Sequence, residues 1–370
     1  MKFRAERSEF ADAITWALRS VGARATLPAL SGVLLRLEGD ELQLSSTDLE
    51  LSGTLRLPVQ VEQEGTALIP GRLLGDVVRT LPNAAVEAEV NGDVLQLTCG
   101  RASFALRLMP AEDFPALPQP AEDAAEATLK ADVFATTVTQ VGRAASTDEH
   151  RPALTGVHLA SADGVLTAAA TDSYRLAVRS VPWDAAVDAQ ALIPRRALDE
   201  GRRAAESLGA DVHLLLEGSQ ATISLPDRRL TTRLLEGTFP EYQNLIPQTV
   251  ERQLRVDRAA LLETVKRVAV VGEANTSATP VTLQISADTV EVTAGSGEVG
   301  KAEEALPGQL DGEPLQIGFN PRYLADGLEV AGGEEVTLEF RDELKPAVLR
   351  PGAEPDEGGD FLYLLMPVRL

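Results

Sequence analysis

The sequence predicts an α+β fold built from three similar domains in tandem, and two observations predict it. The first is repetition at one offset: PALSGV at residues 28–33 recurs as PALTGV at 152–157, and LIP at 68–70 recurs at 192–194, each 124 residues later. The second is that helical and strand-like segments follow one another in the same order in each copy. Repetition of a whole unit favours a symmetric or ring-like assembly over a single catalytic cleft.

A fainter third copy follows the first two. Val33 and Val157 are followed by Val281 at the same interval, and IPGR at 69–72 has a counterpart in FNPR at 319–322. A stretch rich in Pro and Ala, residues 115–125, indicates a linker. A second boundary falls just after Pro247. We therefore expect domains at 1–122, 123–248 and 249–370, each of ordinary domain size.

Each copy is expected to place two helices on a mostly antiparallel sheet. In the first copy Phe10, Ile14 and Leu18 recur at helical spacing, and residues 55–61 then alternate as a strand does. A second apolar helical stripe follows at 73–81. In all, six segments are expected to be helical: 7–24, 70–80, 131–151, 194–208, 256–275 and 320–332.

The net charge of −22 argues against a protein that binds nucleic acid by charge alone, because affinity for DNA normally comes from Lys and Arg. The charge is unevenly distributed, however. The six helical segments hold 15 of the 34 basic and 14 of the 56 acidic residues, which leaves 19 basic and 42 acidic residues elsewhere. Nearly neutral helices could therefore face DNA while the acidic remainder repels nonspecific nucleic acid.

Several kinds of chemistry are not indicated by the sequence. The single cysteine, Cys99, excludes an internal disulfide and a cysteine-based metal cluster, and its alternating surroundings predict a buried or half-buried thiol. The three histidines, His150, His158 and His213, lack zinc-ligand spacing, so no metal or other cofactor is expected. The first residues lack the apolar core of a signal peptide, and no apolar run is long enough to span a bilayer. These features predict a cytoplasmic location.

An ordered set of short motifs carries a resemblance that covers the whole chain. It includes RATLP at 24–28, STDLE at 46–50, TDSYRL at 171–176, FPEY at 239–242 and the final MPVRL at 366–370. No single motif is decisive, but the set and its order are specific. In these motifs the sequence resembles the beta subunit, or sliding clamp, of bacterial DNA polymerase III.

The resemblance implies a fold and a function. The fold would be three tandem DNA clamp domains, forming half of a six-domain ring that a head-to-tail homodimer closes. The function would be a non-catalytic sliding clamp that encircles double-stranded DNA without sequence preference and confers processivity on the replicative polymerase. The implied partners are the polymerase catalytic subunit, the clamp loader, and other polymerases and repair proteins that carry clamp-binding peptides.

The resemblance also implies which residues face DNA. These are Arg24, Arg72, Arg151, Arg195, Arg196, Arg202 and Arg203. In the segment 194–208 the arginines lie seven residues apart in pairs, so each pair shares one helical face. The spacing alone equally fits a solvated helix with pairs such as Arg202 with Glu206. Pro152 and Ala153 stand where some family members have two tyrosines, which puts stacking on single-stranded DNA in doubt.

A hydrophobic peptide-binding pocket is implied between the second and third domains. Its residues would be Leu154, Thr171, Ser173, Tyr174, Arg175, Leu176, Pro240, Asn244, Leu245, Leu364, Leu365, Met366, Pro367, Val368 and Arg369. Ser173 and Tyr174 stand where the family pattern has Gly-His, and Asn244 replaces a commonly basic residue. The alternative is that Leu364 and Leu365 belong to the last strand of the core.

The implied dimer interface joins the first domain of one chain to the third domain of its partner. It would use Arg101, Phe104, Leu106, Val270, Val271, Glu298, Glu303 and Glu304, an apolar patch with a charged rim. The alternative for Val270 and Val271 is an ordinary helix core. An acidic α+β hydrolase with a carboxylate pair is the alternative for the whole protein, but no unrepeated polar cluster supports it. A dimer of twice 39.4 kDa would distinguish the clamp.

Overall fold

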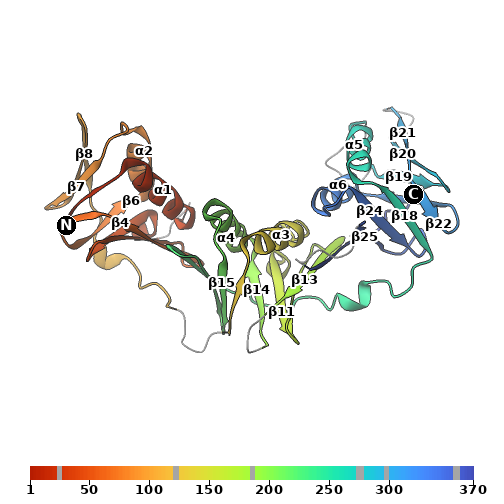
Figure 1. Cartoon of the computed structure of the whole chain (residues 1–370), viewed down its shortest axis with the longest axis horizontal. Helices are drawn as coiled ribbons and strands as arrows, with labels where there is room; N and C mark the ends of the chain where they lie inside the picture. Colours follow the sequence, from red (N-terminus) through yellow and green to blue (C-terminus); the bar gives the residue numbers. More distant parts are fainter. Residues whose placement is uncertain (23–26, 120–124, 184–187, 272–278, 296–299, 353–358) are drawn as a thin grey trace. The chain divides into compact units, whose positions relative to one another are not determined.

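The computed structural model describes residues 1–22, 27–119, 125–183, 188–271, 279–295, 300–352 and 359–370 (Figure 1). The chain forms two compact units. The first unit comprises Met1–Ala131 and Glu200–Leu234, and the second comprises Asp132–Asp199 and Leu235–Leu370. Every strand pairing between the strands named below is antiparallel, as the repeated alternation predicted.

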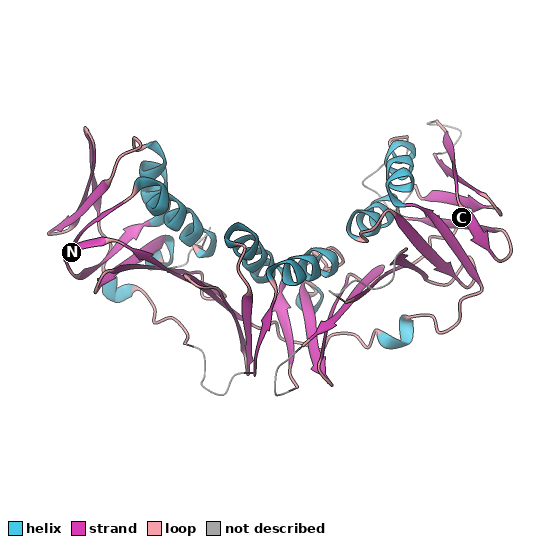
Figure 2. Ribbon diagram, viewed as in Figure 1, coloured by secondary structure: helices cyan, strands magenta, loops and turns pink. Residues whose placement is uncertain are grey.

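The first unit contains two sheets and two helices of the first copy. The eight-stranded sheet runs in the order β10 (Ala125–Leu129), β15 (Val212–Glu217), β16 (Gln220–Ser224), β17 (Arg228–Arg233), β4 (Leu51–Pro58), β3 (Glu41–Thr47), β2 (Gly32–Glu38), β6 (Gly65–Pro70). The five-stranded sheet runs β5 (Gln60–Gln63), β1 (Lys2–Ala5), β7 (Val86–Asn91), β8 (Val94–Cys99), β9 (Ala102–Arg107). The helices are α1 (Arg7–Ala17) and α2 (Gly71–Thr80), which pack on each other (Figure 2).

The core of the first unit follows from the alternation of β2 to β4. Leu35, Leu42 and Leu44 are completely buried on the face that α1 covers, while the residues between them face the other way. Gly53 lies under α1, where a Cβ atom would stand 3.1 Å from the Trp16 ring and 2.6 Å from Ser20 Oγ. Glycine at this position therefore allows the helix to lie directly on the sheet.

The second unit repeats this arrangement. Its nine-stranded sheet runs β14 (Gln190–Pro194), β11 (Gly156–Ala162), β12 (Val165–Thr171), β13 (Arg175–Pro182), β26 (Asp360–Leu365), β25 (Ala347–Pro351), β24 (Glu335–Phe340), β18 (Arg252–Asp257), β22 (Gln309–Asp311). A four-stranded sheet runs β21 (Ala302–Pro307), β20 (Thr289–Ala294), β19 (Val281–Ile285), β23 (Leu315–Phe319). Its helices are α3 (Ala131–Gly142), α5 (Arg258–Ala269) and α6 (Pro321–Val330), and α4 (Arg195–Leu208) has residues in both units.

Backbone ladders join the repeated copies. In the first unit β17 of the second copy pairs with β4 of the first, with Thr231 opposite Ser52. In the second unit β26, the last strand of the chain, pairs with β13 of the second copy, with Leu364 opposite Leu176. Because these ladders are continuous, the second copy divides between the two units. The domain boundaries near 122 and 248 stay a prediction.

The six predicted helical segments all contain a helix, but three of the helices are shorter than expected. The segment 131–151 is helical only to Gly142, because residues 143–151 form turns in which Ser146 and Arg151 bond to the main chain or to Asp148. The first helix ends at Ala17 and continues as one 3-10 turn, Leu18–Ser20. The helix of 256–275 ends at Ala269, and residues 272–275 lie outside the described residues.

Candidate peptide-binding surface, DNA-facing arginines and interface strands

The turn 171–175 joins β12 to β13 through side-chain to main-chain hydrogen bonds. Thr171 Oγ1 accepts the N–H of Ser173 at 3.1 Å, and Asp172 Oδ1 accepts the N–H groups of Tyr174 at 3.0 Å and Arg175 at 3.1 Å. Ser173 has a φ of 82°, in the left-handed region. This conformation points Tyr174 into solvent, where 58% of it is exposed.

Arg175 lies beneath this turn in a buried network. Its guanidinium donates to Asp172 at 2.9 Å, to Tyr363 Oη at 3.2 Å, and to Asp326 of α6. Burial alone would lower the pKa of Arg175, but Tyr363, Asp326 and Asp172 outweigh it and hold the pKa above its ordinary value. Burial also raises the pKa of the Tyr363 phenol. The network therefore fixes a charged Arg175 and joins the turn to β26 and α6.

Apolar side chains of different segments gather around the turn. The Tyr174 ring stacks on Tyr323 of α6 with 6.2 Å between centroids, and the Arg175 guanidinium lies 4.5 Å from the same Tyr323 ring. Met366 N–H donates to Tyr174 O at 2.9 Å, so the chain end runs beside the turn. Leu245 is 50% and Met366 is 40% exposed, although both are large and apolar.

The buried members of the predicted site form the base of this surface. Leu176 and Leu364 belong to one apolar cluster with Val348 and Tyr242, and Leu154, Thr171 and Leu365 are buried as well. Leu364 and Leu365 are thus the end of a core strand, as the alternative reading had it, and the exposed surface begins at Met366. Ser173, Pro240, Asn244 and Arg369 are exposed, and Pro367 and Val368 are half-buried.

Tyr323 and Asp326 were missed by the sequence reasoning, although they contact Tyr174 and Arg175. They follow the motif FNPR at 319–322, which marks the start of α6. That motif located the helix, but nothing in the sequence indicated which of its side chains reach the turn.

The second linker (residues 235–246) packs tightly beside the same cluster. Its Leu235 N–H donates to Leu192 O at 2.8 Å. Phe239 is 9% exposed and stacks on His158 with 5.1 Å between ring centroids, and it meets Tyr242 edge-on. Burial lowers the pKa of His158, whose Nδ1 has no hydrogen-bond partner among the described residues.

The arginines of α4 lie on a clearly amphipathic helix. Ala197, Leu198, Ala204 and Ala205 are buried, whereas Arg196 and Arg203 are exposed and Arg195 and Arg202 are half-buried. Arg202 pairs with Glu206 at 2.8 Å, as the solvated-helix reading predicted. Asp199 pairs with Arg195 at 3.4 Å, and Arg203 binds Glu200 at 2.6 Å.

The other predicted DNA-facing residues are placed differently. Arg72 is exposed on α2. Arg151 pairs with Asp148 at 3.0 Å and donates to Ser173 Oγ at 3.2 Å, so it lies beside the turn 171–175. Arg24 lies outside the described residues.

The predicted interface residues lie on two edge strands and at the end of α5. Strand β9, with exposed Arg101 beside it, carries half-buried Phe104 and buried Leu106, and β21 carries Glu303 and Glu304. Each strand is at the edge of its sheet. Val270 is 78% exposed at the C-terminus of α5, so it is not helix core, and Val271 is half-buried.

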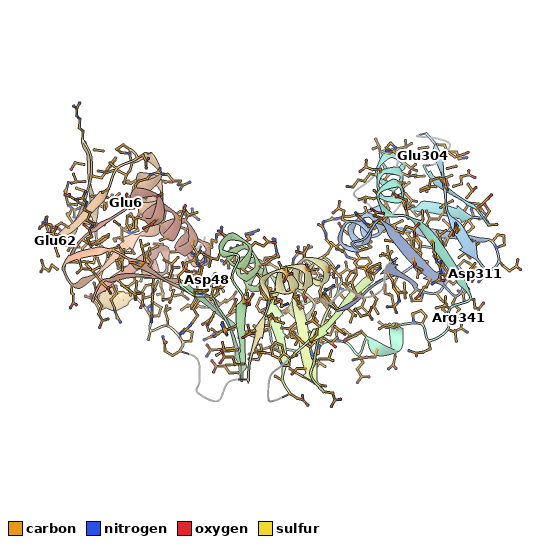
Figure 3. The ribbon with its side chains drawn as sticks, viewed as in Figure 1. Glu6, Asp48, Glu62, Glu304, Asp311 and Arg341 are labelled. Atoms are coloured by element: carbon orange, nitrogen blue, oxygen red, sulfur yellow. The ribbon has the colours of Figure 1, made fainter. Side chains whose placement is uncertain are left out.

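The acidic residues near this edge already have partners. Glu304, labelled in Figure 3, binds Arg267 of α5 at 2.6 Å, and Glu303 binds Lys301 at 2.6 Å. These pairs hold the pKa of each carboxyl below its usual range. A direct bond from Arg101 would therefore compete with them. Glu298 lies outside the described residues.

No group of three or more His, Cys, Asp or Glu side chains is placed to hold a metal ion among the described residues. The helices of the described part of the chain include none long and apolar enough to cross a membrane.

The repeated architecture defines the class of protein as one built from tandem DNA clamp domains. Family models match three consecutive parts of the chain, described as the N-terminal (1–118), central (128–241) and C-terminal (243–369) domains of the DNA polymerase III beta subunit. The chain therefore belongs to the DNA polymerase III beta subunit family, and it is a sliding clamp of DNA replication. Proteins of this family are processivity factors and generally non-catalytic, and the hydrolase alternative is not supported.

Relatives and solved structures agree with this assignment over most or all of the chain. The beta sliding clamp of Streptomyces coelicolor is 40% identical, with both chains completely covered. That of Micrococcus luteus is 37% identical over 84% of this chain and 100% of its own. The sliding clamp of Bacillus subtilis superposes with a TM-score of 0.94 at 28% identity, covering 100% of this chain and 99% of its own. A Pseudomonas aeruginosa clamp bound to griselimycin gives 0.93 at 28% identity, with full coverage of both chains.

Proposed function

We propose that this clamp acts as a head-to-tail homodimer whose ring is closed by β9 of one chain and β21 of the other. The supporting observation is that both strands are sheet edges with the same burial pattern, half-buried and exposed residues in alternation before a buried leucine, Leu106 or Leu306. Unpaired edges of this kind pair readily with another strand. The exposed Val270 would be covered in the same contact. Three domains per chain are supported by the three family matches, which leave gaps at 119–127 and at 242, beside the proposed boundaries near 122 and 248.

The dimer contact can be tested by the sedimentation mass. Val270→Asp places a charge in the proposed contact, and the mass should fall from a dimer towards the single-chain 39.4 kDa. Leu344→Asp is the matched control, because Leu344 is 58% exposed and lies outside the proposed contact. A dimer that withstands V270D would place the interface elsewhere.

Topological linkage to DNA follows from a closed ring. The test loads labelled clamp onto nicked circular DNA with a clamp loader and ATP, raises the salt, and then cuts the circle. Retention on the circle and release after cutting are expected, because a ring that is held by topology needs little affinity for DNA. If cutting makes no difference, binding is electrostatic and the ring proposal fails.

The exposed surface around Tyr174, Leu245 and Met366 would dock the hydrophobic peptides of polymerases, the clamp loader and repair proteins in the cytoplasm. Its large apolar side chains are exposed over a well-packed base, and Met side chains suit a surface that accepts several ligands. Clamps of Pseudomonas aeruginosa and Bartonella birtlesii have been crystallised with griselimycin. We propose that griselimycin competes for this surface here as well.

A reciprocal exchange of residues tests this surface. Tyr174→Glu introduces the residue that stands at the equivalent place in the first copy, Glu50, and should weaken binding of a fluorescein-labelled Leu- and Phe-containing peptide by at least about tenfold. Glu50→Tyr is the control and should leave that affinity unchanged. Equal affinities for wild type and Y174E, by fluorescence anisotropy with griselimycin as competitor, would move the peptide site away from the turn.

A further inference from the structure

The linker predicted at 115–125 starts earlier in the structure, at Met109, and its described part up to residue 119 is called the first linker (residues 109–119). A groove lies under it, on the face of the eight-stranded sheet that α1 does not cover. Two adjoining cavities form it, of about 490 and 240 Å³, and they share residues such as Ser52, Pro115 and Thr231. All lining residues belong to the first unit. The groove includes the turn 47–51 through Thr47, Leu49 and Glu50.

The position of this groove corresponds by repetition to the proposed peptide surface. Thr47 and Thr171 are 124 residues apart, and each begins a turn between equivalent strands. The linkers also start alike: Met109 N–H donates to Leu68 O at 2.8 Å, and Leu235 N–H donates to Leu192 O at 2.8 Å. The first turn, like the second, therefore lies beside a candidate binding surface.

The floor of the groove is polar and basic. Strand register places Arg36, Gln43 and Arg56 in one cross-strand row, and Ser45, Thr54 and Arg229 in the next. Neighbours in such rows have Cβ atoms about 5 Å apart, so positive charges gather on one small area. In the described part of the chain the exposed side chains of Arg36, Arg56 and Arg229 have no carboxylate partner. Arg228 beside them is paired with Asp227 at 2.7 Å.

The opposite wall is apolar and comes from the linker itself. Phe114, Pro115, Leu117 and Pro118 are half-buried there. An occupant must therefore present carboxylates to the arginines and aliphatic groups to the prolines. A concave site lined by charges of one sign also concentrates their field on its ligand.

We propose that this groove is a second docking site, which binds an extended acidic segment of a partner protein with aliphatic residues between its carboxylates. Hydroxyl and amide groups of the floor suit the main chain of such a segment. Single-stranded nucleic acid fits less well, because base stacking needs exposed aromatic side chains. Among the described lining residues only Phe114 is aromatic. The choice of a peptide rests in part on the proposed function, through the equivalence with the surface around Tyr174.

The test uses the full-length clamp and a fluorescein-labelled octapeptide of alternating Asp and Leu. Arg56→Glu with Arg229→Glu should weaken its binding by at least about tenfold at physiological ionic strength. The matched control, Arg255→Glu with Arg341→Glu, changes the net charge equally at exposed positions outside the groove and should have little effect. Circular dichroism checks that both double variants are folded. Hydrogen exchange should show protection by the peptide at 111–119 and 224–231.

Each contrary result is distinguishable. Equal loss in the control pair would mean unspecific charge attraction and would overturn the proposal. The proposal would also be overturned if labelled oligothymidylate binds more tightly than the octapeptide and R56E/R229E abolishes that binding. The groove would then be a nucleic-acid site. Tyr174→Glu should leave the octapeptide affinity unchanged, and R56E/R229E should leave that of the Leu- and Phe-containing peptide unchanged. If Y174E removes octapeptide binding, the octapeptide binds the surface around Tyr174. The proposal of a docking site in the groove is then wrong, while the proposed function stands.

Discussion

The turns 47–51 and 171–175 have the same main-chain structure and different side chains. In the first, Thr47 Oγ1 accepts the N–H of Leu49 at 3.0 Å, and Asp48 Oδ1 accepts two further N–H groups at 3.1 and 2.8 Å, matching the bonds of Thr171 and Asp172. Asp48 is labelled in Figure 3. The third residue is left-handed in both, with φ values of 77° and 82°. The Thr-Asp pair thus builds the turn, and the residues after it decide its use.

The linkers differ in the same way. In the second copy Phe239 stacks on His158 and closes over the sheet. In the first copy Leu34 stands at the place of His158, and both Leu34 and Phe114 line the larger cavity. The two linkers thus begin with equivalent main-chain hydrogen bonds but differ further along. The second linker packs tightly on the sheet, whereas the first linker borders an open groove. The comparison indicates that duplication preserved the scaffold while the two surfaces diverged in chemistry.

The largest expected effect is at Arg175, which has Leu51 as its counterpart. Arg175→Ala leaves the buried Asp172 without its cation and leaves the half-buried Asp326 with Arg143 at 3.7 Å, which should cost about 3–5 kcal/mol of stability. Arg341→Ala is the control, because among the described residues the Arg341 side chain pairs only with the exposed Glu251, at 3.9 Å, and less than about 1 kcal/mol is expected. Urea unfolding followed by tryptophan fluorescence measures both. Similar losses in the two variants would show that the buried network is not a special anchor.

A smaller effect is expected when the same change is made in both turns. Asp172→Asn and Asp48→Asn each keep an acceptor for the turn N–H groups but remove the charge. In the second turn the buried Arg175 loses one of its two carboxylates, so about 1–3 kcal/mol should be lost. In the first turn Leu51 stands in place of the arginine, so no buried guanidinium loses a carboxylate and a smaller loss than for D172N is expected. Equal urea midpoints for D172N and D48N would contradict this difference.

Much of this fold could be predicted from the sequence because duplication makes the pattern visible twice. PALSGV and its repeat PALTGV lie at the starts of β2 and β11, and the two LIP segments lie at the ends of β6 and β14. Most helix ends were predicted to within one turn. Helix 131–151 was overextended, because apolar spacing continues past Gly142 while the hydrogen bonds of Ser146 and Asp148 favour turns.

The sites were less predictable because they depend on contacts between distant segments. That Tyr323 would stack on Tyr174 depends on β13 pairing with β26, which no local pattern encodes. The arginine rows of the groove depend on the register of β2, β3 and β4, where a shift by one residue would bury them. Local periodicity therefore predicts the helices and strands, whereas the binding surfaces depend on the register of strands that are far apart in the sequence.

A modest gain in stability is expected from glycine at the left-handed positions. Ser173→Gly and Leu49→Gly each remove a side chain from a conformation that costs L residues about 1 kcal/mol, so each should raise stability by roughly 0.5–1 kcal/mol. Ser31→Gly, at a half-buried 3-10 residue without positive φ whose hydroxyl donates to Pro28 O at 2.6 Å, should not do so. Thermal unfolding compares the three. A fall in Tm for both turn variants would show that their side chains contribute more than the backbone strain costs.

The smallest effect concerns His158 and pH. Burial places the pKa of His158 in the folded protein below its unfolded value of about 6.5, so the unfolded state binds more protons when the pH falls below that value. Stability should therefore be unaffected above about pH 6.5 and should decline by less than about 1 kcal/mol as the pH falls towards 5, since the ring is only partly buried. His158→Leu, which copies Leu34 of the first copy, should remove this part of the decline in urea midpoints. An unchanged slope in H158L would assign the pH response to other groups, and the stacking on Phe239 would then tolerate a charged imidazole.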